Sequence, residues 1–223
     1  MLIYGARNLL RTGHIAFEGV EGGDDAMRSL TVWSVAFGVC LKAHLRRSLN
    51  EPDAALRELS IWLREDELAI LRGVRSQPHA CLQVLSRVVR LAPPEHRDAL
   101  DANIVRFEEV LGRCERISRV PIPLSYSRHT SRFLSAWAFL LPLELFSNGG
   151  GSALLFAPLI TFLLFGVDQI GVQLEQPFFV LPLDLLVDKL KVDGEEAAVL
   201  HARLAARDRL AARAGASAAT NGG

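Results

Sequence analysis

The sequence lacks the short motifs that mark most enzymes and metal sites. It contains no GxGxxG or GxxxxGKS/T phosphate loop, no HExxH zinc motif and no GxSxG nucleophile elbow. Its six histidines lie in separate segments, so no catalytic or metal-binding cluster is evident along the chain. We therefore expect a protein that is not an enzyme and that holds neither a metal ion nor another cofactor.

Cysteine is scarce, and no CxxC pair is present. The three cysteines, Cys40, Cys81 and Cys114, are an odd number and lie far apart in the sequence. This spacing is not that of a disulfide framework or a zinc site. It predicts reduced thiols that are buried in helices.

Neither sign of charge is in excess, since 25 basic residues balance 25 acidic residues. A neutral chain gives no electrostatic reason to expect nucleic acid or an acidic polymer as a partner. Hydrophobic residues make up 50% of the chain, and the excess is concentrated between residues 133 and 172. That concentration favours a membrane protein with a polar partner domain.

Strand patterns are missing as well, and helical spacing of apolar residues covers the first 120 residues. We predict a helical layer with polar outer faces there. Its segment 29–41 is uncharged but has only 13 residues, which is short of the roughly 20 that a membrane span needs. This segment is therefore expected to be buried in a helical bundle. A further helix is predicted to start at Asn50–Asp53 and to continue through ALRELSIWLREDELAILRGV.

Two long runs without charge follow, one of 11 residues between Arg132 and Glu144 and one of 23 residues between Glu144 and Asp168. They predict two antiparallel membrane helices, the first from about Pro123 and the second from about Ser152 to Gln176. A soluble buried hairpin is the alternative, because neither run is a clean span. The basic residues before the first helix place both open ends in the cytosol or the stroma.

The expected organisation is all-α, with a membrane hairpin packed against a helical bundle. It has a helical region at 1–120, the hairpin at 121–176, a segment at 177–200 that packs on the helical region, and a tail at 201–223 that passes from helix to disorder. The hairpin is expected to end at Pro177-Phe178. This pair forms a corner and not a catalytic site.

Three phrases resemble, in order and spacing, the bestrophin-like family of anion channels. They are ARNLLR at 6–11, AFGVCLKAHLR at 36–46 taken with CERISRVPIPLSYSRHTSRFL at 114–134, and FGVDQIGVQLEQPFFVLPLDLL at 165–186. The most specific parts are the Ile-Pro-x-x-Tyr and Glu-x-Pro-Phe phrases. The residues that carry them are Ile122, Pro123, Tyr126, Glu175, Pro177 and Phe178.

The resemblance implies an anion channel that conducts chloride or another small anion passively and assembles as a ring of five subunits. Arg119, Arg128 and Arg132 would then raise the anion concentration at the inner mouth of the pore. The alternative for these three arginines is a basic collar that faces lipid headgroups. Animal members bind activating calcium through acidic residues after Pro-Phe, but here apolar residues follow, so no calcium site is expected.

The phrase VLPLDLL at 180–186 is similar to the plant, algal and cyanobacterial branch of the family. That similarity implies a plastid thylakoid membrane, with the plasma membrane as the alternative. Members of the family carry two membrane helices ahead of ARNLLR, so we expect this chain to begin near the end of the second. A truncated, non-conducting scaffold subunit is the alternative function.

Overall fold

The computed structural model of the protein describes residues 1–46, 54–119, 124–175 and 177–220, and its elements are helices. In chain order they are α1 (Leu2–Phe17), α2 (Gly23–Leu45), α3 (Ala54–Leu59), α4 (Glu65–Leu71), α5 (Gln77–Val89), α6 (Pro94–Arg119), α7 (Leu124–Gly149), the 3-10 turn η1 (Gly150–Ser152), α8 (Ala153–Glu175), α9 (Pro177–Val180) and α10 (Leu183–Thr220). These ranges contain no strand, so the all-α prediction is confirmed.

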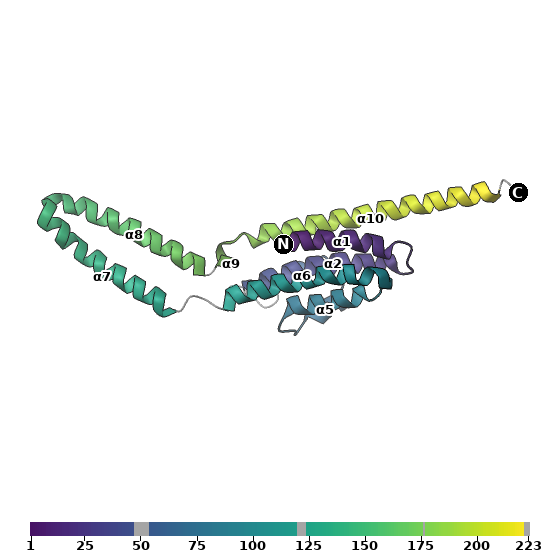
Figure 1. Ribbon diagram of the computed structural model, residues 1–223, viewed down its shortest axis with the longest axis horizontal. Coiled ribbons are helices and arrows are strands. Elements are labelled where there is room, and N and C mark those ends of the chain that lie inside the picture. The colour runs from purple at the N-terminus through teal and green to yellow at the C-terminus, as the bar shows by residue number, and fades with distance from the viewer. Residues whose placement is uncertain (47–53, 120–123, 176, 221–223) are drawn as a thin grey trace. The chain divides into compact units, whose positions relative to one another are not determined.

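Contacts divide the chain into two units. The first comprises Met1–Cys114 and Pro182–Gly223, and the second comprises Glu115–Leu181. The first unit therefore joins the amino-terminal helices to α10, while the second contains the hairpin of α7 and α8 (Figure 1). The finer division at residues 120, 176 and 200 stays a prediction.

Helix α2 forms the centre of the first unit. It contacts α1, α3, α5 and α10, and every residue from Leu30 to Leu41 is buried. Two of these side chains, Trp33 and Phe37, are at most 2% exposed, and burying each contributes about 1.5–3 kcal/mol. The prediction that this uncharged segment is buried in a bundle is confirmed.

Among the contacts of helix α6 with this core are a pair of aromatic rings and a buried amide. The rings of Phe37 and Phe107 are stacked, with centroids 5.0 Å apart. Asn103 is 1% exposed, and its side chain donates to the Ala99 carbonyl and accepts a hydrogen bond of 2.7 Å from the Asn8 amide. A buried amide is costly without partners, so these bonds fix α1 against α6.

The thiols of Cys40 and Cys81 are free and buried, with their sulfur atoms 3.9 Å apart between α2 and α5. Burial raises the pKa of Cys81 well above its ordinary value, which keeps that thiol protonated and unreactive. Cys114 is free and only partly buried in α6. The prediction of buried thiols therefore holds for two of the three.

The prediction of a single helix after Asn50–Asp53 is wrong, because the described part of that segment forms two short helices. The backbone N–H groups of Trp62 and Leu63 both donate to the Leu59 carbonyl, which closes a tight turn between α3 and α4. Helix α4 then starts where the Glu67 carboxylate accepts the Arg64 backbone N–H at 2.8 Å. The same carboxylate pairs with Arg28 of α2 at 3.0 Å, so a tertiary contact overrides the helical periodicity.

Helix α10 packs along α1 and α2 through its first half. Val187 and Leu190 are nearly fully buried, and Gly194 is the last buried residue of the described part of the helix. A Cβ at Gly38 would lie 2.5 Å from the Leu190 side chain, and one at Gly194 would lie 3.0 Å from Val35. Glycine at these positions therefore permits the close approach of α10 to α2.

In the second unit, α7 and α8 run antiparallel and are joined by η1 (Figure 1). Pro142 lies inside α7 and Pro158 lies inside α8. The hairpin agrees with the predicted pair of helices, and α7 ends at Gly149, directly before η1. Gly150 begins this turn with a φ of 59°, a conformation that favours glycine.

Candidate functional site

The three arginines proposed for an anion vestibule all lie in the second unit and are exposed. Arg119 is the last residue of α6, and its guanidinium is 3.2 Å from the Glu115 carboxylate. Arg128 and Arg132 lie on α7 four residues apart, which is one turn and therefore one face. Neither makes an ion pair within the described residues. Their charge is available to an anion or to a lipid headgroup.

The residues of the two family phrases are described only in part. Ile122 and Pro123 lie outside the described residues, and the side chains of Tyr126 and Glu175 do as well. Helix α8 ends at Glu175, and α9 begins at Pro177, so the predicted end of the helix is confirmed. Phe178 is 8% exposed, so its side chain is buried.

The hairpin exposes many large apolar side chains, which is unfavourable in water. The side chains of Phe139, Phe146 and Phe162 are at least two-thirds exposed. Gly150–Leu174 is long and apolar enough to cross a membrane, and only 6% of its most apolar window is buried. No other helix in the described part of the chain is both long and apolar enough to cross a membrane. Helix α7 carries two charged residues, Arg132 and Glu144. Such an exposed apolar surface calls for lipid or for other protein segments.

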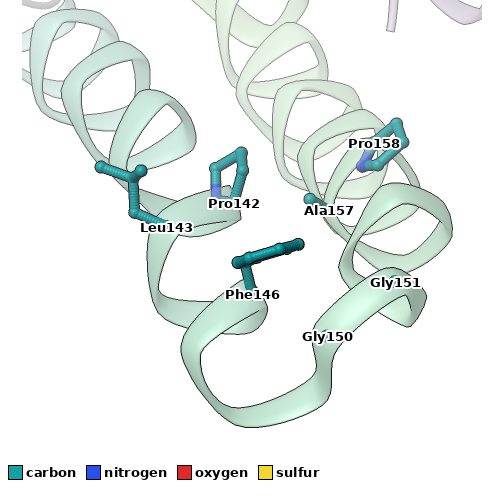
Figure 2. Close-up of a pocket in the computed structure, with 7 residues that line it drawn as sticks. All are labelled: Pro142, Leu143, Phe146, Gly150, Gly151, Ala157 and Pro158. Carbon is teal, nitrogen blue, oxygen red and sulfur yellow. The ribbon is translucent and has the colours of Figure 1, made fainter.

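A groove between α7 and α8 was not predicted from the sequence. It has a volume of about 570 Å³, and Figure 2 shows Pro142, Phe146 and Ala157 in the space between the two helices. Its other lining residues are Leu143, Gly150, Gly151 and Pro158. Proline inside a helix removes a backbone hydrogen bond and bends the axis. The sequence feature that could have indicated this groove is the pair of prolines, one on each side of the glycine turn.

The VLPLDLL phrase enters an ion-pair network in the first unit. The Asp184 carboxylate accepts a hydrogen bond of 2.7 Å from Arg46 and lies 3.2 Å from the Lys42 ammonium. Lys42 and Lys191 both reach Glu58, at 2.8 and 2.6 Å. The Arg46 guanidinium lowers the pKa of Asp184 most strongly. The network ties α2, α3 and α10 together and keeps these carboxylates ionised.

The pKa of Glu58 is lowered as well. Partial burial acts in the opposite direction, but the hydrogen bonds from Lys191 and Lys42 outweigh it. Glu67 follows the same pattern, because burial is outweighed by the hydrogen bonds from Arg28 and the Arg64 backbone. These contacts describe a braced structural unit and supply no catalytic acid or base.

Residues 1–196 match the sequence profile of the family described as Bacterial/Fungal Bestrophin protein. This match covers most of the chain. The chain belongs to the bestrophin family. The resemblance carried by the three phrases is thereby confirmed.

Among the relatives of this bestrophin are two named chloride channels. It is 29% identical to the chloroplastic voltage-dependent chloride channel 2 of Arabidopsis thaliana over 94% of this chain and 52% of that protein. It is 32% identical to channel 1 of the same plant over 73% of this chain and 39% of the relative. A voltage-dependent anion channel-forming protein of Nostoc is 28% identical over 85% of this chain and 62% of its own length. The bestrophin chain thus spans about half the length of these relatives.

Solved structures support the fold of this bestrophin. A crystal structure of a bacterial bestrophin homologue from Klebsiella pneumoniae matches with a TM-score of 0.79 and 21% identity. The match covers 88% of this chain and 74% of the other. The bestrophin-like helical fold predicted from the sequence is confirmed.

Proposed function

We propose that this chain is a subunit of a bestrophin-type channel that lets chloride or another small anion cross a membrane passively. The observation that carries the proposal is the family match over residues 1–196. Plant and cyanobacterial relatives named as chloride or anion channels support it. Conduction of this kind needs no cofactor, and no nucleic-acid partner is expected from a chain of balanced charge.

In this account the hairpin of α7 and α8 lies in the bilayer. The exposed phenylalanines and the apolar stretch Gly150–Leu174 support that placement, because lipid tails satisfy a surface that water does not. Charges are absent from the turn, whereas Arg128 and Arg132 lie near the start of α7. The open ends of the hairpin then face the cytosol or the stroma.

Arg128 and Arg132 are the residues we assign to anion attraction. Two cationic groups on one face of α7 create a positive potential that concentrates anions near a pore mouth. Arg119 contributes less, because Glu115 neutralises much of its charge. An anion drawn in this way would shed part of its water at an apolar constriction and then pass through.

We propose further that the channel is a homo-oligomeric ring, with five subunits as the family resemblance implies. A ring requires head-to-tail contacts, which leave the pore on its axis. The chloroplastic names of two relatives support a plastid membrane. The thylakoid is the proposed membrane, and the plasma membrane is the alternative.

Chloride efflux from liposomes tests the role of the arginines. The longest natural protein that contains this chain is reconstituted, and efflux is compared with that of a double variant, Arg128→Gln with Arg132→Gln. We expect the variant to conduct several-fold more slowly at about 0.01 M salt and nearly normally at about 0.3 M, because added salt screens the lost charges.

Arg87→Gln on α5 is the matched control, since Arg87 is also exposed. It should conduct normally at both salt concentrations. Unchanged efflux in the double variant would assign the two arginines to lipid headgroups instead. No efflux from inserted, unmodified protein would contradict the channel proposal and favour a non-conducting scaffold.

A further inference from the structure

Two histidines that are far apart in the sequence meet in the first unit. His14 of α1 and His201 of α10 approach with their Nδ1 atoms 3.0 Å apart and their ring centroids 4.6 Å apart. The other nitrogen of His201, Nε2, lies 3.0 Å from an oxygen of Asp24 on α2. The cluster, called here the histidine latch, therefore links three helices.

The hydrogen bond between the two Nδ1 atoms needs one proton and one lone pair. The bond forms in the neutral pair, where His14 donates from Nδ1 to His201 and His201 donates from Nε2 to Asp24. It also forms in the singly charged pair, where His201 donates from both of its nitrogens. Neutral His14 then accepts at Nδ1 and carries its own proton at Nε2. A second proton would put N–H groups on both Nδ1 atoms, so the bond is lost and two positive charges face each other.

The surroundings of His14 oppose this second proton. Burial lowers the pKa of His14, and the neighbouring His201 lowers it further, while the Ala197 carbonyl and Glu18 act in the opposite direction. The Ala197 carbonyl favours the charged ring, yet no acceptor among the described residues has hydrogen-bond geometry to His14 Nε2, which is buried. A charged His14 is therefore disfavoured while the latch is closed.

His14 and His201 line a pocket that charged groups share. Glu18 and Glu21 lie between α1 and α2, Asp25 lies on α2 and Arg207 lies on α10. The carboxylates attract protons to this end of the unit, whereas Arg207 repels them. The 3.0 Å between the two Nδ1 atoms leaves room for a proton on only one of them, so the closed latch carries at most one added proton.

The latch lies where α10 has little else to hold it. From Glu195 to Arg207 no described residue of α10 is buried. The ion pair of Arg7 with Asp193 and the buried Leu190 hold the helix before this point. His201 ties this distal part of α10 to α1 through His14 and to α2 through Asp24.

We propose that the histidine latch is an acid-released tie: it holds the distal part of α10, from Glu195 to Arg207, onto α1 and α2 and frees it when both histidines are protonated. Release needs no bond chemistry beyond the uptake of one further proton. The helix before Gly194 stays packed because its contacts are apolar or are ion pairs of Asp184, Lys191 and Asp193, and none of them involves a histidine. This inference does not depend on whether the chain conducts anions.

Hydrogen–deuterium exchange of the full chain at pH 7.5 and 5.5, corrected for the intrinsic pH dependence of exchange, tests the proposal. The segment 195–207 should lose about tenfold in protection at the lower pH, because a histidine with an ordinary pKa in the open state favours opening by that factor. His14→Gln should abolish this loss, since the glutamine oxygen accepts from protonated His201. His201→Gln is a second variant and should keep part of the loss, because burial still lowers the pKa of His14.

His79→Gln on α5 is the control, because His79 is exposed and lies on another helix. It should behave like the unmodified chain. Segment 81–89 of α5 should keep its protection at both pH values in every variant. An acid-dependent loss in His14→Gln equal to that of the unmodified chain, no loss in the unmodified chain, or a parallel loss in α5 would overturn the proposal.

Discussion

Glycine residues differ sharply in the room around them. A Cβ at Gly23 would collide with the Phe17 backbone carbonyl, which cannot move without shifting the end of α1. A Cβ at Gly112 of α6 would meet no atom within 4 Å. At Gly23 the effect of an alanine is therefore set by a steric clash. At Gly112 it is set by helix propensity alone.

We predict opposite effects of alanine at these two positions. Gly23→Ala should lower the free energy of unfolding by about 1–3 kcal/mol through the forced shift. Gly112→Ala should raise it by about 0.5–1 kcal/mol, because alanine favours a helix and restricts the unfolded chain. Urea titration of both variants measures the difference, and a stabilised Gly23→Ala protein would contradict the packing at the start of α2.

The ionised carboxylates of Glu58 and Glu67 make the first unit sensitive to acid. Both have a pKa below the ordinary value of 4.5, so the unfolded chain binds more protons than the folded chain in that range. Their contribution to stability is complete above about pH 4.5 and is lost as the pH falls through the lowered values. We expect the free energy of unfolding to decline from about pH 4.5 downward.

Denaturant titrations between pH 7 and pH 3 check this expectation. Glu58→Gln should lower stability at pH 7 by about 1–3 kcal/mol, since it leaves two partly buried ammonium groups without their carboxylate. The variant should also show a shallower decline in acid. Glu65→Gln is the control, because its pair with Arg72 is exposed and worth little. Equal declines in all three proteins would show that other groups control acid stability.

At the scale of elements, α10 is one helix with two very different halves. Leu190 is 1% exposed and meets α2 at Gly38, whereas Leu204 is 39% exposed. Leu190→Ala should therefore destabilise the protein by about 2–5 kcal/mol. Leu204→Ala on the same helix should cost less than about 1 kcal/mol. Thermal and urea unfolding compare the two, and equal costs would contradict the packing of α10.

Sequence periodicity was sufficient to predict those helices whose local pattern agrees with their packing in the fold. The uncharged segment of α2 is buried as its length and composition predicted, and α8 ends at Glu175, before the Pro-Phe corner. The break between α3 and α4 was missed because it depends on the pair of Glu67 with Arg28, which are 39 residues apart. No local pattern contains that information.

The candidate sites depend even more on contacts between residues that are far apart in the sequence. Exposure of Arg128 and Arg132 agrees with a basic collar that the sequence could indicate, because charge near an apolar run is a local feature. The contact of His14 with His201 joins positions 187 residues apart, and the sequence placed these histidines in separate segments. The groove at Pro142 and Ala157 depends on how two helices face each other, which periodicity does not specify.

At the scale of the whole molecule, the two units have contrasting surfaces. The first unit buries Trp33, Phe37 and Phe107 and carries ion pairs outside, as a helical layer that faces water does. The second exposes phenylalanine and leucine along α7 and α8. This contrast, together with membership of the bestrophin family, is the basis of the proposal that one unit is embedded in lipid and the other meets the aqueous phase.

The reversal potential in a planar lipid bilayer tests whether the protein conducts anions, as we propose. The longest natural protein that contains this chain is inserted, and current is recorded under a gradient of potassium chloride. We expect a reversal potential near the chloride equilibrium potential. This potential should move when chloride is replaced by a large organic anion. A current that reverses near the potassium equilibrium potential, or no current from verified insertions, would contradict it.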